Sequence, residues 1–219
     1  MCASIPKGSR RNFCYTEPMH TYEAQTFNLP ALDGISQKSV DEHLGLYQGY
    51  VKNFNAISTK IAEYAKEDTE KHAHALSELI RRKSFEFDGM RLHEMYFEQF
   101  EGGSTTLTTG GPLAEALKKE YHEYFQEYFK AIGSMRGPGW AMLYYDPAPP
   151  TGGQFQAGFA GEQHQGHFVT LPIILALDVW EHAFLLDYGA QGKGKYIDAF
   201  FTNLNWNILE KRYAQATNS

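Results

Sequence analysis

The sequence contains little of what marks several large classes of protein. Its two cysteines, Cys2 and Cys14, have no apolar signal core before or between them, so we expect no disulfide framework and a reducing cytoplasm. The 20 basic residues are outnumbered by 26 acidic ones, which gives a net charge of −6. Without a basic stripe, nothing indicates a nucleic-acid partner. No apolar run reaches the roughly 18 residues of a membrane span, so no membrane partner is expected.

What the sequence does contain is enough apolar material for one large domain or two small ones. Apolar residues make up 42% of the 219 residues and aromatic residues 15%, which is sufficient for a sizeable core. The first segment, Met1–His20, has basic residues but no clear periodicity. We expect it to be a poorly ordered extension or an arm that packs late.

Helical periodicity dominates the first half of the chain. A helix is predicted to begin at a serine cap, either Ser36 or Ser39, because apolar residues then recur at spacings of three and four. A second helical tract is predicted over residues 60–82, with one charged and one apolar side.

A third helix is predicted after an interruption at residues 85–89. Asp88 is the expected cap of this helix, which reaches Phe100. His93 lies on its apolar stripe and is therefore expected to face inward. A buried histidine is most often an ordinary core residue, so a role for His93 requires a second half-site opposite it.

The second half of the chain mixes strands and helices. The run Glu101–Pro112 is rich in glycine and threonine, breaks every period and is the best candidate for a boundary between two domains. Consecutive strand-like runs with short connections predict an antiparallel sheet. The predicted strands are Trp140–Tyr145, Gln154–Phe159 and Phe168–Leu177, and the predicted helices are Leu113–Ile132 and Tyr196–Tyr213.

The stretch Leu171–Tyr188 carries the strongest chemical signal. A short apolar run that suits a buried strand is followed by a helical segment, with Asp178 and His182 four residues apart and so on one helical face. A carboxylate and an imidazole placed together form half of a site for Fe, Mn or Zn, whereas the ordinary alternative is a helix-capping aspartate beside a core histidine. His43 and His93 are the candidates for the other half.

Five segments, in the same order along the chain, resemble the iron/manganese superoxide dismutases and especially their archaeal branch. These segments are RLHEMYFE around His93, GPGWAMLYYD, EQH…LPIIL, DVWEHA at 178–183 and FFTNLNWNILEKRY. The resemblance covers residues 27–213. It implies an α+β fold, in which an N-terminal helical hairpin domain (27–103) follows an N-terminal extension (1–26) and precedes an α/β domain (104–219) with a three-stranded antiparallel sheet.

The resemblance also implies a reaction and its residues. It implies dismutation of superoxide to dioxygen and hydrogen peroxide, with one Fe or Mn ion per chain bound by His43, His93, Asp178 and His182. Tyr50 matches the tyrosine that gates proton supply. His164 matches the archaeal position that contacts metal-bound solvent, with His167 as the alternative. The aromatic residues expected to wall the site are Trp140, Trp180 and Tyr96.

The sequence departs from the family pattern at the substrate entrance. The histidine normally found one turn after the first ligand is absent, with Leu46 and Tyr47 in that region, and the tyrosine after the last ligand is Leu185. This leaves open a fold relative with a different oxidative activity behind a remodelled entrance, or a structural protein without turnover.

Two further expectations follow from the resemblance. The chain is one residue short before Tyr50, so counting backward from Tyr50 puts Glu42 at the first ligand position and counting forward puts His43 there. We expect His43, because its spacing of seven from Tyr50 puts both on one helical face. Glu181 matches a residue that bonds across a dimer, so we expect a homodimer or homotetramer.

Overall fold

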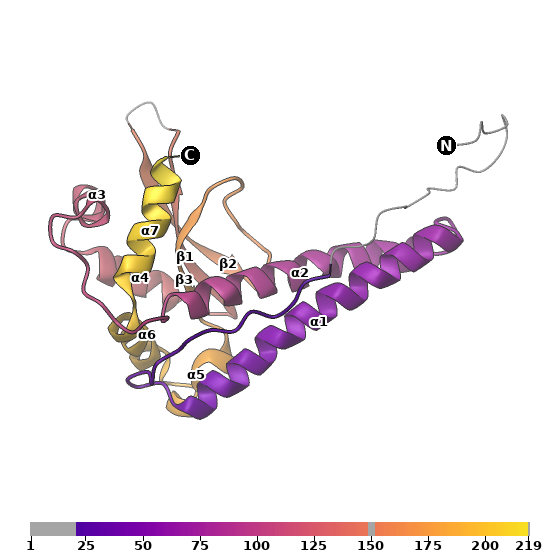
Figure 1. The fold of residues 1–219 in the computed structure, drawn as a ribbon, viewed down its shortest axis with the longest axis horizontal. Coiled ribbons are helices and arrows are strands. Elements are labelled where there is room, and N and C mark those ends of the chain that lie inside the picture. The colour runs from indigo at the N-terminus through magenta and orange to yellow at the C-terminus, as the bar shows by residue number, and fades with distance from the viewer. Residues whose placement is uncertain (1–20, 149–151, 219) are drawn as a thin grey trace.

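The computed structural model describes residues 21–148 and 152–218. Met1–His20, including both cysteines, lies outside these residues, so the expectation for that segment stays a prediction. The described residues form an N-terminal hairpin of two long helices followed by a sheet with helices around it (Figure 1). The predicted fold class is therefore confirmed, while the exact domain boundaries stay a prediction. No helix in the described residues is long and apolar enough to cross a membrane.

The hairpin consists of α1 (Gln37–Glu67) and α2 (Ala73–Glu98). Ser36 is the cap of α1, because its side chain accepts a hydrogen bond from the backbone N–H of Ser39 at 3.1 Å. The prediction of a second tract at residues 60–82 is wrong at both ends, since α1 continues to Glu67 and the turn follows it. Figure 1 shows this turn far from the sheet.

The predicted interruption at residues 85–89 and the Asp88 cap are also wrong, because α2 is continuous there. Gly89, within this segment, has a packing role. A Cβ atom at Gly89 would lie 2.6 Å from Cδ1 of Tyr50 on α1. Gly89 therefore lets the aromatic ring of one helix lie directly against the backbone of the other.

Gly89→Ala is expected to lower the free energy of unfolding by about 1–3 kcal/mol, which is the usual cost of overpacking a well-packed contact. The gain in helix propensity from glycine to alanine, about 1 kcal/mol, only partly offsets the clash. Urea unfolding of both proteins measures the difference.

Gly49→Ala is the matched control, because Gly49 lies on α1 with nothing within 4 Å of an added Cβ. This variant is expected to be as stable as the parent or up to about 1 kcal/mol more stable. If Gly89→Ala were equally harmless, Gly89 would not be a close-packing position.

The sheet contains β1 (Gly139–Asp146), β2 (Gln154–Gly161) and β3 (Ile173–Asp178) in the order β2-β1-β3, with both pairs antiparallel. The central strand β1 is buried along almost its whole length. In its pairing with β3, Trp140 lies opposite Asp178. The sheet thus places an aromatic side chain next to the carboxylate predicted to bind metal.

Three predicted elements in this half are shorter or divided. Residues 168–172 precede β3 without joining it, and Thr170 has a φ of +69° that an extended strand does not accommodate. The predicted helix Leu113–Ile132 ends at His122, whose φ is +55°. Tyr196–Tyr213 is divided before Asn205, which caps the last helix. The observed helices are α3 (Pro112–Tyr121), α4 (Phe125–Gly133), α5 (Glu181–Tyr188), α6 (Lys193–Asn203) and α7 (Trp206–Thr217).

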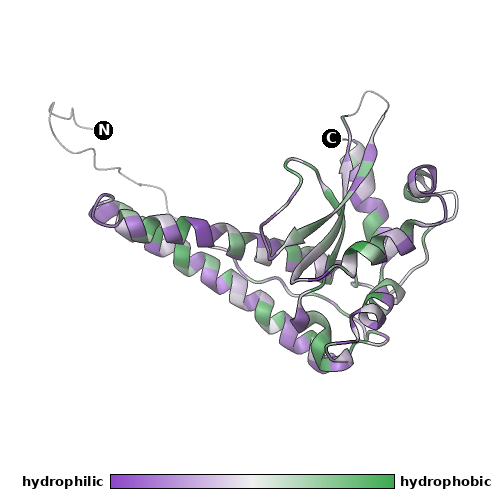
Figure 2. Ribbon diagram, turned by 180° about the vertical axis from the view of Figure 1, so that it is seen from behind, coloured by the Kyte–Doolittle hydropathy of each residue, from purple (hydrophilic) through white to green (hydrophobic). Residues whose placement is uncertain are grey.

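The helix α5 joins the two halves of the molecule, because it follows β3 and contacts both α1 and α6. Figure 2 shows strongly apolar residues on α5, next to the beginning of α1. The base of the hairpin, the end of β3 and α5 therefore meet in one region.

Candidate metal centre

Four side chains converge where the hairpin meets the end of β3. His43 comes from α1, His93 from α2, Asp178 from the last position of β3 and His182 from α5. One nitrogen or carboxylate oxygen of each lies within 4.8 Å of the others. Three of the four residues are buried and His182 is half-buried. The structure thus brings together the four residues that the resemblance implies as ligands.

The turn after β3 orients Asp178 for two roles at once. Its Oδ1 accepts a hydrogen bond from the backbone N–H of Trp180 at 2.8 Å, which fixes the entry into α5. Its Oδ2 lies 3.0 Å from Nε2 of His182. Asp178 can therefore hold the start of α5 and bind a metal at the same time, because the two roles use different carboxylate oxygens.

All three imidazoles point an Nε2 atom at the same carboxylate oxygen. The distances to Asp178 Oδ2 are 3.2 Å from His43, 3.6 Å from His93 and 3.0 Å from His182. Nδ1 of His93 lies 2.6 Å from the carbonyl oxygen of Gly89, which requires the proton on Nδ1. In the neutral ring Nε2 then carries only a lone pair.

That lone pair is buried and has no hydrogen-bond partner in the described residues. A bare nitrogen beside a carboxylate is unfavourable unless a cation lies between them. The donor set therefore fits a metal ion, with a carboxylate and neutral imidazoles as ligands.

Burial and charge determine the protonation of these groups. Burial alone would raise the pKa of Asp178, but the charges and hydrogen bonds of His182 and His43 hold it well below its usual range. Burial, reinforced by the charge of His43, lowers the pKa of His93 to about 3. Burial also lowers the pKa of His43, against the opposing effect of Asp178. The cluster thus favours an ionised Asp178 with neutral imidazoles at His43 and His93, the forms that bind metal.

Aromatic rings surround the imidazoles. Trp140 lies edge-on to His93, with ring centroids 5.2 Å apart, and Trp180 stacks on His182 at 5.8 Å. Tyr96 lies 4.9 Å from His43. These are the three residues predicted to wall the site, and each contacts a different histidine, so together they limit access of water to the cluster.

Gln163 is the residue that the sequence analysis missed. It is fully buried, its Nε2 donates to the Tyr50 hydroxyl at 2.8 Å, and its Oε1 accepts from the Trp140 indole at 2.7 Å. The Tyr50 ring in turn lies 4.9 Å from that of His93. The only sequence signal was its place in the EQH segment, beside the histidine that was chosen instead.

His164 and His167 lie in the same loop but outside the group of four. His164 is edge-on to Phe85, with ring centroids 5.6 Å apart, and its Nδ1 lies 3.8 Å from a Glu162 carboxylate oxygen. His167 reaches the backbone carbonyl of Gln163 with Nε2, at 2.9 Å. Among the described residues, neither histidine hydrogen-bonds to the side chains of Tyr50, Gln163 or Trp140, and only His167 hydrogen-bonds to Gln163, through its backbone carbonyl.

The entrance region is apolar. A hollow of about 480 Å³ is lined by His182 together with Leu46, Leu185 and Leu186. Glu42 also lines this hollow and is exposed, whereas His43 is only 4% exposed and belongs to the cluster. Because α1 is a regular α-helix at this point, consecutive residues are about 100° apart around its axis, so Glu42 faces the hollow while His43 faces the cluster.

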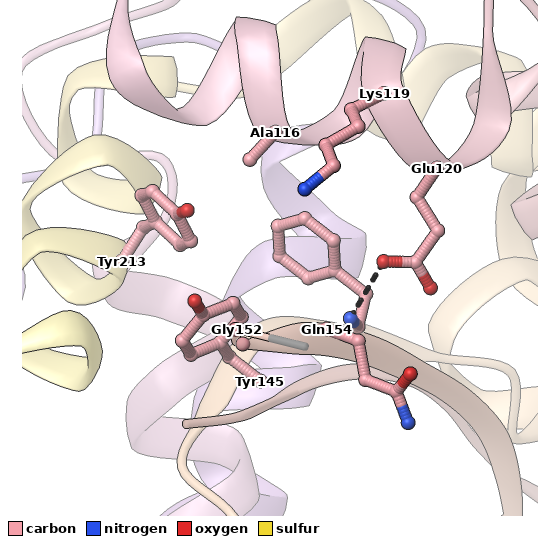
Figure 3. A pocket seen from close by; sticks show the side chains of 9 residues that line it. Ala116, Lys119, Glu120, Tyr145, Gly152, Gln154 and Tyr213 are labelled. Carbon is pink, nitrogen blue, oxygen red and sulfur yellow. Dashed lines mark hydrogen bonds between the residues drawn. The ribbon is translucent and has the colours of Figure 1, made fainter. Parts of the chain in front are cut away.

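A second hollow, of about 490 Å³, lies away from this centre (Figure 3). It is lined by Lys119, Glu120 and the aromatic rings of Tyr145, Phe155 and Tyr213. Glu120 already accepts a hydrogen bond from the backbone N–H of Phe155 at 2.8 Å, shown by the dashed line. This hollow has no group of acids, bases and ligands comparable with the histidine cluster.

Comparison with known proteins places the chain in a family. Residues 109–212 match the family model described as iron/manganese superoxide dismutases, C-terminal domain. A superoxide dismutase (Fe) of Saccharolobus solfataricus is 32% identical over 183 residues, covering 81% of this chain and 85% of that protein.

Two further relatives extend this likeness beyond a single lineage. A superoxide dismutase (Fe) of Cupriavidus metallidurans is 32% identical over 191 residues, covering 84% of this chain and 91% of that protein. A superoxide dismutase (Mn/Fe) of Aeropyrum pernix is 30% identical over 185 residues, covering 81% of each chain. The chain belongs to the iron/manganese superoxide dismutase family.

Proposed function

We propose that this protein converts superoxide to dioxygen and hydrogen peroxide, with one Fe or Mn ion per chain held by His43, His93, Asp178 and His182. The observation that carries the proposal is the convergence of three imidazole Nε2 atoms on one buried carboxylate oxygen. The names of the relatives, which specify Fe or Mn/Fe, support the choice of metal.

The donor set suits this chemistry. Three neutral imidazoles and one carboxylate contribute a single negative charge, which neutralises part of the charge of a +2 or +3 ion. When bound, the metal supplies one-electron redox chemistry by alternating between these two states. The buried aromatic surroundings stabilise the neutral forms of the imidazole ligands and limit the access of solvent.

Tyr50 is the proposed proton donor for the half-reaction that forms peroxide. Its hydroxyl oxygen accepts a hydrogen bond from Gln163, so its own proton remains free to be donated. Burial, followed by the charge of Asp178, raises the pKa of Tyr50 to about 12 against the effect of Gln163. The phenol therefore keeps its proton at neutral pH until a stronger base develops beside it.

The metal assignment is tested by His182→Ala. The purified parent protein is expected to carry about one Fe or Mn per chain, and the variant to lose it, because one of only four donors is removed. His164→Ala is the matched control and should keep its metal. Metal analysis of the three proteins, followed by a dismutase assay on each, measures both properties.

The same assay separates the remaining alternatives. Full metal content in His182→Ala would show that the site is wrongly placed. A metal-loaded parent without dismutase activity would instead support a different oxidative activity. The proposed catalytic role of His164 stays a prediction, and full activity in His164→Ala would contradict it.

We further propose a homodimer, or a dimer of dimers, formed through the entrance face. Leu46, Leu185 and Leu186 are between 42% and 48% exposed, and they surround the half-buried His182. Glu181 is exposed beside that histidine. A second chain would cover this apolar surface and bring an acidic group toward the site.

Leu185→Glu is expected to shift the protein to monomers, because it places a charge in the centre of the proposed contact. Met135→Glu is the control, since Met135 is 50% exposed elsewhere on the surface. Sedimentation at micromolar concentration measures both. An unchanged oligomer in Leu185→Glu, or a parent that is monomeric, would contradict the proposal.

A cytoplasmic location is the last part of the proposal. It rests on the cysteine usage of the sequence, which offers no disulfide framework suited to an oxidising compartment. Fractionation of the source cells tests it.

A further inference from the structure

We propose that His167, anchored by Tyr144, positions Gln163 for the reaction. This inference rests on the proposed function, because it concerns the network that holds the Tyr50 hydroxyl. Gln163 lies in the turn between β2 and β3, so its backbone is not held in a helix or a strand. Its side chain nevertheless must hold two partners, Tyr50 and Trp140, at 2.8 and 2.7 Å.

The main chain of Gln163 is held by an imidazole. Nε2 of His167 lies 2.9 Å from the Gln163 carbonyl oxygen, so this nitrogen carries the proton and donates it. Among the described residues, no backbone N–H donates to the same carbonyl. Loss of the imidazole would therefore remove the contact that fixes this peptide group.

The position of His167 is fixed in turn by Tyr144. Nδ1 of His167 lies 3.1 Å from the Tyr144 hydroxyl, which is also 3.3 Å from Sδ of Met142. The imidazole nitrogen is the stronger acceptor, so it takes the hydroxyl proton when Nε2 carries the proton of the ring. The Tyr144 side chain is buried and packs against Phe168 with ring centroids 5.1 Å apart. The anchor is thus a rigid group on the central strand of the sheet.

The same strand holds both ends of Gln163. Trp140 and Tyr144 are four residues apart on β1, so their side chains emerge on one face. Trp140 receives the carboxamide directly, and Tyr144 holds the backbone through His167. His167 is therefore a positioning residue, which acts on the reaction only through the place it gives to Gln163.

Two substitutions of similar size separate this role from simple packing. In His167→Gln, the amide nitrogen reaches the place of the imidazole Nε2 and can still donate to the Gln163 carbonyl. In His167→Asn, the shorter amide ends near the place of Nδ1 and leaves that carbonyl without its donor. A structural role in filling space would affect both variants alike.

The indole N–H of Trp140 reports where the Gln163 carboxamide lies, because its proton resonance depends on the hydrogen bond to Oε1. We would record it by NMR in protein loaded with Zn²⁺, a d¹⁰ ion without redox chemistry. Trp140→Phe assigns the signal. We expect His167→Gln to keep the parent resonance and His167→Asn to shift it.

The dismutase assay on the Fe- or Mn-loaded proteins gives the second readout. At equal metal content we expect about tenfold lower activity in His167→Asn and activity within about twofold of the parent in His167→Gln. A parent-like indole resonance in His167→Asn, or equal losses in both variants, would overturn the role. If His167→Asn does not fold, His167→Leu is the second variant that removes the donor, and an unmoved resonance there overturns the proposal.

The two readouts also separate this inference from the proposed function. If the metal-loaded parent has no dismutase activity, the proposed function fails, while a resonance that shifts in His167→Asn alone still supports the positioning of Gln163. If the parent is active and the Trp140 indole resonance is the same in both variants as in the parent, the proposed function stands and the positioning role is wrong.

Discussion

His43→Ala is expected to weaken metal binding by more than about 100-fold, since loss of even an outer hydrogen-bond partner of a ligand costs about 10–100-fold. Glu42→Gln is expected to leave metal content nearly unchanged. The neighbouring residues differ in position as well as in chemistry. His43 is buried with Nε2 3.2 Å from the Asp178 carboxylate, whereas Glu42 lines the exposed entrance hollow.

A second carboxylate in the first position would also change the charge of the site. It would stabilise the +3 state of the metal relative to the +2 state and so hinder the reductive half of dismutation. Metal analysis and competitive chelation on both variants measure the binding. Metal loss in Glu42→Gln with retention in His43→Ala would reverse the assignment.

The four proposed ligands carried sequence signals of different strength. The spacing of four between Asp178 and His182 predicted one helical face, but Asp178 is the last residue of β3 and only His182 lies in α5. The apolar stripe around His93 indicated an inward position. The assignment of His43 depended on the resemblance, because the periodicity of its helix does not show which other residues it faces in the fold. Only the tertiary arrangement brings α1 and α2 to the end of β3.

Gln163 shows why the rest of the site was not predictable. It lies in a turn, where neither a period of 3.6 nor one of 2 indicates which side chain is buried. A glutamine also titrates nothing, so it does not attract attention as an acid or base. Its importance comes from hydrogen bonds to Tyr50 and Trp140, residues 113 and 23 positions away in the sequence.

The wrong helix boundaries arise because tertiary contacts and single-residue backbone conformations are not visible in a periodic pattern. Asp88 and Gly89 were predicted at the start of a helix, but α2 is continuous there and contact with Tyr50 requires a glycine within it. His122 gave the opposite error, because its left-handed backbone divides two helices at a residue type that carries little turn signal.

Arg212→Met is expected to lower the free energy of unfolding by about 1–3 kcal/mol, the usual cost of leaving buried hydrogen-bond acceptors without their donor. The Arg212 guanidinium is only 9% exposed and holds together three elements. From α7 it donates to the Met95 carbonyl at 2.9 Å and to the Glu98 carboxylate at 2.6 Å, both on α2. It also donates to the Ile174 carbonyl of β3 at 3.3 Å.

Methionine keeps much of the volume but supplies no donor, so the buried Ile174 carbonyl and Gln99 Oε1 lose a partner, while the half-exposed Glu98 carboxylate turns to water. Lys211→Met is the control, because Lys211 is the exposed neighbour on the same helix and its loss should change stability by at most about 0.5 kcal/mol. Denaturant unfolding of the two variants at equal metal loading compares them.

The arginine network also bears on the metal centre, through the elements that it joins. Gln99 follows α2 and is fully buried. Its Nε2 donates to the Ala176 carbonyl at 2.8 Å, its Oε1 accepts from the Ala176 N–H at 2.9 Å, and the same Oε1 accepts from Arg212 at 3.1 Å. The helix held here carries His93, and the strand ends at Asp178. Arg212→Met should therefore weaken metal binding as well as stability. A variant that unfolds like the parent would contradict the role of Arg212 in holding α2, β3 and α7 together.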